Sequence, residues 1–341
     1  MFVNICFADI HLSGVAKIRP RWDSVENHTD TTKSGDYYYL YQARLHLKAD
    51  IGEGWYFSTK LGHNGIAYWA GKFSEGELPN SEALSIAGRS SLSFMELYYG
   101  LSREKYGFAL GLVPINGIGN PVLDIHYYPR NMTEIPWLIL NNNAYHGFSS
   151  FLKLGGGKLN ARLSVDNNVK QSSEYNGMKT KSSDQNTVML SYDYSNTSGM
   201  SASPWLIKTF GGDTLGNPLT LGANLTLSII RGFTLFTSYY ITSQSQEGTD
   251  TYSGNLLRVG LKGKIGPGTL VGWFDKTGYN PEDGNTANGS FVWIHYQYTL
   301  FKSEAGQVIL KPTVRLLRKS ENNQSTFSRS KFELTTVMKF Q

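Results

Sequence analysis

Three basic residues near the start of the chain, Lys17, Arg19 and Arg21, occupy every second position. Side chains at alternate positions of an extended strand point to the same face, so these cations would share one face. Other alternating segments carry basic residues in the same phase, and the full set is Lys17, Arg19, Arg21, Arg44, Lys48, Lys60, Lys311, Arg315 and Lys331. Positive charge gathered beside an aqueous path attracts anions through weak, repeated contacts.

The sequence contains no complete catalytic or metal-binding motif. Residues 155–158 (GGGK) lack the following Ser or Thr of a phosphate loop and are better explained as a hairpin turn. Residues 117–119 (GIG) lack the third glycine of a dinucleotide site, and no HExxH or clustered Cys/His ligands occur. The strongest candidate for a catalytic pair of a hydrolase is His146 with Asp124 or Ser149. We therefore expect no enzyme activity, no cofactor and no metal.

The basic residues belong to segments in which apolar and polar residues alternate along almost the whole chain. We predict sixteen strands, from Ile10–Trp22 and Tyr37–Ala49 to Ser330–Phe340. Seven connections are short turns, most of them with Gly or Ser, and eight are longer and polar, such as Asp23–Asp36 and Lys319–Phe327. Short and long connections alternate, which is typical of an up-and-down antiparallel barrel.

The composition agrees with a sheet that is apolar on one face and wet on the other. Apolar residues make up 40% of the 341 positions, aromatic residues 13%, and glycine is frequent at 36 residues. A run of about 18 apolar residues is absent, which excludes a helical membrane span. The net charge of +5 is modest, and no run of lysine or arginine indicates a nucleic-acid partner.

The last eleven residues, Lys331 to Gln341, alternate strictly. Phe332, Leu334, Met338 and Phe340 fall on one face, and charged residues fall largely on the other. This segment resembles the closing strand of Gram-negative outer-membrane β-barrels, although that family usually ends on the aromatic residue itself. The resemblance extends from Asp9 to Phe340. It implies an all-β, transmembrane antiparallel barrel of the sixteen-stranded diffusion-porin type, with short periplasmic turns and long extracellular loops.

Outward aromatic residues should form two belts, with Trp22, Tyr39, Tyr41, Tyr239 and Phe332 near one rim and Trp55, Phe57, Tyr99, Phe233, Tyr298 and Phe340 near the other. Three outward prolines count against regular strands, because proline removes a donor from the hydrogen-bond ladder. We expect these prolines near strand ends or bulges; they are Pro20, Pro204 and Pro312.

Closure of the barrel would make the last strand the neighbour of the first, so the nine basic residues would form one contiguous wall. The 30-residue connection 115–144 resembles the third extracellular loop of general porins, which folds into the barrel and narrows the pore. The constriction residues implied by that resemblance are Asp124, His126, Arg130 and Glu134, of which Asp124 and Glu134 would face the basic wall. A loop packed externally at a subunit contact is the alternative.

We expect an outer-membrane porin that lets small hydrophilic solutes diffuse passively and prefers anions. A substrate-selective porin for phosphate or sugar acids, an outer-membrane barrel enzyme and a soluble glycan-binding β-sandwich remain alternatives. The resemblance implies one barrel domain (9–341), both termini in the periplasm, a homotrimer, and lipid or lipopolysaccharide as surroundings. Residues 1–8, which include the single cysteine Cys6, are interpreted as the tail of a secretory signal.

Overall fold

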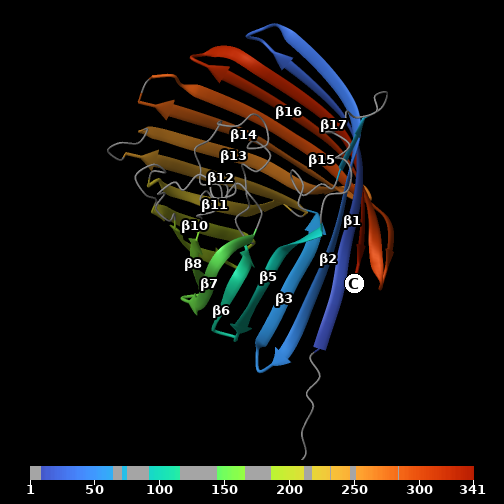
Figure 1. Ribbon diagram of the computed structural model, residues 1–341, viewed down its shortest axis with the longest axis vertical. Helices are drawn as coiled ribbons and strands as arrows, with labels where there is room; N and C mark the ends of the chain where they lie inside the picture. Colours follow the sequence, from blue (N-terminus) through green and yellow to red (C-terminus); the bar gives the residue numbers. More distant parts are fainter. Residues whose placement is uncertain are drawn as a thin grey trace, which may run out of the picture.

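A computed structural model describes residues 9–63, 71–74, 92–115, 144–165, 186–210, 217–230, 232–245, 251–282 and 284–341. These residues form one antiparallel sheet that curves into a barrel (Figure 1). The strands are β1 (Asp9–Asn27), β2 (Thr32–Gly52), β3 (Trp55–His63), β4 (Gly71–Ser74), β5 (Leu92–Ser102), β6 (Tyr106–Pro114), β7 (Ala144–Leu154), β8 (Gly157–Val165), β9 (Asn186–Ser195), β10 (Met200–Phe210), β11 (Leu219–Ile230), β12 (Phe233–Gln244), β13 (Tyr252–Ile265), β14 (Gly268–Pro281), β15 (Ala287–Ser303), β16 (Gly306–Glu321) and β17 (Gln324–Phe340). No helix among these residues is long and apolar enough to cross a membrane.

The sheet closes on itself between its first and last strands. β17 pairs with β1 from Gly14 opposite Phe340 to Asn27 opposite Phe327, and the blue and red strands lie side by side in Figure 1. The short β4 pairs with β2 beyond the end of β3, so β3 and β4 share one place in the ring. The result is a closed barrel of sixteen strands, as the alternation predicted. Four residues are too few for an alternation to reveal, and β4 was not predicted.

The two faces of the strands differ as the period of two requires. In β17, Phe332, Leu334 and Met338 are 44–50% exposed, whereas Lys331 and Glu333 are buried. Many large apolar side chains elsewhere are exposed in the same way, which in a water-soluble protein would create an aggregation surface. Outward aromatic residues contact one another across strands, as Trp22 and Phe332 do with ring centroids 5.6 Å apart. The barrel is therefore apolar outside and polar inside.

The three prolines lie within strands, and the prediction of strand ends or bulges is wrong. Pro20 faces Tyr39 of β2 in regular register, while on the β17 side the pairing passes from Ile18 to Arg21 without a shift. Pro204 and Pro312 show the same one-sided gap, and Figure 1 shows these strands continuous. A strand residue directs its N–H to only one neighbour, so each proline removes one bond and leaves the other ladder intact.

Two predicted long connections are in fact tight hairpins. β1 and β2 are paired up to Asn27 opposite Thr32, and β16 and β17 are joined by Asn322 and Asn323 alone. Both asparagines have positive φ, 47° and 65°, as a two-residue type I′ turn requires. The polar residues that suggested loops still pair as strands, because the backbone ladder does not depend on side-chain polarity. These strands therefore extend well beyond the apolar band.

Candidate functional site

The nine basic residues predicted to form a wall lie on five neighbouring strands, in the order β16, β17, β1, β2 and β3. Their register follows from the pairing. Arg315 faces Lys331 across β16 and β17, Arg21 faces Glu333 across β17 and β1, and His46 faces Lys60 across β2 and β3. The other basic positions lie along the same strands, in the same phase. The structure therefore brings all nine to one side of the barrel.

These side chains point into the barrel, because their neighbours along each strand are the exposed apolar residues. Ile18 and Trp22 are 59% and 44% exposed, whereas Arg21, directly before Trp22, is 8% exposed. On β16, the exposed Leu316 adjoins the buried Arg315. Lys48, near the rim, is exposed on the inward face. The alternation of side chains along these strands therefore gives the barrel a charged inward face at this wall.

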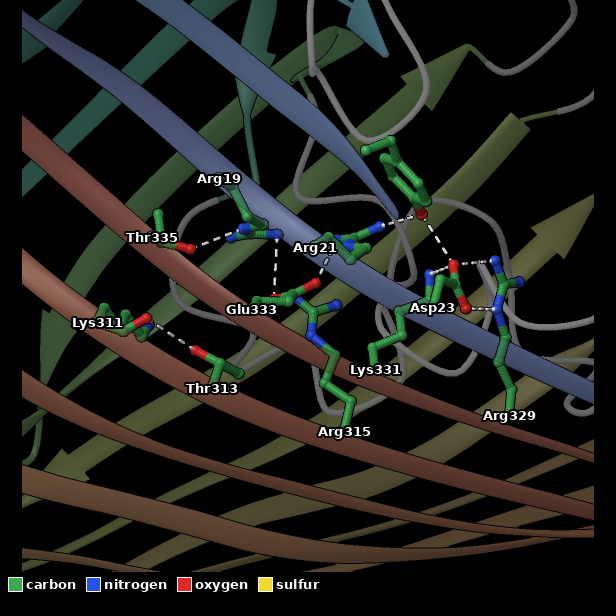
Figure 2. Close-up of polar contacts among 11 residues, drawn as sticks. Arg19, Arg21, Asp23, Lys311, Thr313, Arg315, Arg329, Lys331, Glu333 and Thr335 are labelled. Carbon is green, nitrogen blue, oxygen red and sulfur yellow. Dashed lines mark hydrogen bonds and ion pairs between the residues drawn. The ribbon is translucent and has the colours of Figure 1, made fainter. Parts of the chain in front are cut away.

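We call the part of this wall toward the β1–β2 hairpin the upper wall. Glu333 lies at its centre (Figure 2). Its carboxylate forms ion pairs with Arg21, with Arg315 at 3.0 Å and with Arg19 at 3.5 Å, and its side chain is fully buried. Arg19 also donates a hydrogen bond from Nε to Thr335 Oγ1 at 2.7 Å. Three guanidinium groups from two strands are thus directed at one carboxylate of the strand between them, which stabilises cations that would otherwise repel one another.

A second carboxylate, Asp23, joins β1 to β17 further along the seam (Figure 2). Arg329 donates to both of its oxygens, from Nε at 2.7 Å and from Nη2 at 2.6 Å, and Lys331 Nζ lies 3.2 Å away. The Tyr38 hydroxyl donates to Asp23 Oδ2 at 2.8 Å and accepts from Arg21 at 3.1 Å. Asp23 and Arg329 were not predicted as site residues, because the apolar alternation does not reach them. Continuing the period of two beyond the apolar stretch would have revealed them.

The wall changes character below Glu333, toward the end of the barrel where β1 begins. The charged residues near Lys17 include Arg44, Arg19, Lys311 and Lys339, and all four are positive. No carboxylate within the described part of the chain forms an ion pair with Lys17. The upper wall is therefore an ion-pair network, whereas the lower wall is a cluster of cations. We name the set Lys17, Arg44, Lys311 and Lys339 the lower cation cluster.

The other side of the barrel carries inward acids that are individually paired. Asp275 accepts from Arg258 Nε at 2.6 Å and from Nη2 at 2.7 Å, and it also accepts from Trp273 Nε1 at 3.1 Å. Asp193 accepts from Asn160 and Ser203, each at 2.8 Å. Glu96, in contrast, lies on β5 directly beside the wall and forms an ion pair with the wall residue Lys60. These acids are scattered and hydrogen-bonded locally, so they do not oppose the basic wall as a group.

Aromatic rings support the network from neighbouring strands. The Arg315 guanidinium lies 3.5 Å from the centroid of the Trp293 ring, and Trp293 stacks on Trp273 with centroids 4.8 Å apart. The Arg258 guanidinium in turn lies 4.6 Å from the centroid of the Trp273 ring. Arginine held against an indole face keeps its charge while its position is restricted. This inward ladder of indole and guanidinium groups joins the basic wall to Asp275.

Several predicted residues do not enter this site. The proposed constriction residues Asp124, His126, Arg130 and Glu134 lie outside the described residues, as do residues 1–8. His146 is exposed on the outer face of β7, whereas Ser149 occupies the inward phase with the buried Tyr145, so the strand alternation separates this candidate pair. The described residues contain no group of His, Cys, Asp and Glu side chains suited to a metal ion.

A closed antiparallel barrel of sixteen strands, apolar outside and charged inside, is the architecture of outer-membrane porins. No family model and no curated protein matches this chain. Among solved structures, an anion-selective porin from Comamonas acidovorans superposes with a TM-score of 0.64 at 15% identity, over 98% of this chain and 100% of that chain. Outer-membrane expressed OmpT of Vibrio cholerae gives 0.60 at 8% identity, over 100% of both chains. A mutant of Rh. blastica porin gives 0.54 at 12% identity, over 96% and 100%. The chain thus has the porin fold.

Proposed function

We propose that this protein is an outer-membrane porin through which small hydrophilic solutes diffuse passively, with a preference for anions. The observation that carries the proposal is the segregation of the charges. Nine inward basic residues gather on five adjacent strands. Other inward basic residues, such as Arg162 of β8 and Arg258 of β13, lie elsewhere in the barrel, where the described acids Asp193 and Asp275 are paired one by one. An excess of cations along one wall of an aqueous bore lowers the energy of a passing anion and raises that of a cation.

The outer face supports placement in a membrane. Its exposed apolar band and its aromatic contacts match what lipid-facing barrel strands require. Asp9 and Gln341 lie at the same rim as the β2–β3 turn, which in this proposal is the periplasmic rim. The similar OmpT of Vibrio cholerae has been solved in a trimer form, and we propose a trimer for this chain by that analogy.

Swelling of liposomes that contain the purified protein tests passive diffusion. We expect the rate for neutral sugars to fall smoothly with size and to stay proportional to concentration, because the wall offers them many weak contacts and no deep site. A sugar acid should enter faster than an amino sugar of equal size. Entry of one solute alone, with saturation, would instead support a substrate-selective porin, and liposomes that do not swell at all would contradict the proposal.

A further inference from the structure

A hollow of about 460 Å³ opens at the end of the barrel where β1 begins and β17 ends. The basic groups among its lining residues are Arg44, His46, Lys60, Lys302 and Lys339. Within the described part of the chain, no Asp or Glu side chain belongs to the lining. Lys60 also forms an ion pair with Glu96 of β5. Basic side chains therefore outnumber acidic ones among the described residues that line this hollow.

The strand register explains why these cations converge. Val15 of β1 faces Lys339 of β17 on one side and Arg44 of β2 on the other. Neighbouring strands lie about 4.8 Å apart, so the Cα atoms of Lys339 and Arg44 are separated by roughly 10 Å. Long basic side chains span that gap easily. Gln307 of β16 faces Lys339 on one side and Lys302 of β15 on the other, so the row of paired residues continues to Lys302. Lys17, two residues along β1 from Val15, adds a further cation next to this row.

We propose that this hollow binds a small oxyanion with two or more negative charges, such as a phosphate, a pyrophosphate or a compact polycarboxylate. The proposal rests on the proposed pore function and adds a defined site to it. A monovalent ion can satisfy only part of this arrangement of cations, whereas an ion with several charged oxygens can contact several of them at once.

The test is the effect of inorganic pyrophosphate on the chloride current of single barrels in a planar bilayer. We expect a saturable block that is stronger when pyrophosphate is added on the side of the β2–β3 turn, because the hollow opens there. In the double variant Lys302→Gln and Lys339→Gln, the half-blocking concentration should rise about tenfold, since two exposed ion contacts of modest strength are removed. Both side chains are exposed at the rim, so these replacements should leave the barrel folded.

The control variant is Lys33→Gln in the β1–β2 hairpin, at the opposite end of the barrel, which should block like the wild type. A wild-type chloride current that pyrophosphate leaves unchanged would overturn the site and leave the pore function standing. An equal block in the double variant would also overturn it, because the anion would then bind elsewhere. A wild-type barrel that shows no preference for anions would instead contradict the proposed function itself.

Discussion

Replacing Glu333 with glutamine should lower the free energy of unfolding by roughly 3–5 kcal/mol, the usual result of removing one partner from a buried ion pair. Arg19, Arg21 and Arg315 all form ion pairs with this one carboxylate, whose side chain is fully buried. Glutamine keeps the size and removes the charge, so the repulsion among the three guanidinium groups would no longer be offset. Unfolding by urea in lipid vesicles, followed by tryptophan fluorescence, measures the change.

The matched control is Glu26→Gln. Glu26 also pairs across neighbouring strands, with Lys33 at 2.7 Å, but this pair lies in the more exposed part of the β1–β2 hairpin. Its loss should hardly change stability, because exposed ion pairs contribute little. Adding Arg21→Gln to the Glu333 variant should recover part of the lost stability by removing one of the mutually repelling cations. Equal stability of the Glu333 variant and the wild type would show that the network around Glu333 does not hold the seam.

Reversing three charges of the lower cation cluster should change the sign of ion selectivity. In the variant with Lys17→Glu, Arg44→Glu and Lys311→Glu, the bore loses three cations and gains three anions on the same wall. The remaining arginines around Glu333 are already paired, so they offset this change only weakly. The reversal potential in a planar bilayer under a potassium chloride gradient should move from the sign of chloride preference to that of potassium preference.

A charge reversal of equal size outside the bore is the control for that experiment. Lys276, Lys33 and Arg318 lie on the outward face or on the hairpin, and none of them belongs to the basic wall. Their replacement by glutamate should leave the reversal potential close to the wild-type value, because the sheet or the salt solution separates them from the permeating ions. A similar shift in both variants would mean that net charge, and not the position of the wall, governs selectivity.

The strands were predictable because one physical rule acts along the whole chain. Lipid-facing and inward positions alternate in every strand, so Phe332 and Lys331 reveal their faces from their identities alone. The same rule gives no signal where both faces are polar. For this reason the ends of β1 and β16 were placed several residues too early, and Asp23 was assigned to a loop. The expectation for the prolines was wrong because it assumed that a proline disrupts the hydrogen bonds to both neighbouring strands. A residue directs its N–H to only one neighbour, so only one of the two ladders loses a bond.

The basic wall was predictable only up to the level of strand order. Knowing that β17 closes against β1 places Lys331 and Glu333 among the basic residues of β1, and the structure agrees. Which arginine contacts which carboxylate depends on the register between strands that lie some 300 residues apart, as in the bond of Arg329 to Asp23. A shift of two residues would keep every face correct and change every ion pair. The division into an upper ion-pair network and a lower cation cluster follows from that register.

An open, water-filled bore whose charged wall faces the permeating ions is central to the proposed function. The direct measurement is the current through single wild-type barrels in a planar bilayer with unequal potassium chloride concentrations on the two sides. We predict a conductance that rises in proportion to salt at high concentration, and a reversal potential with the sign of chloride preference. A membrane that stays insulating with the folded protein inserted, or a reversal potential with the sign of potassium preference, would contradict it.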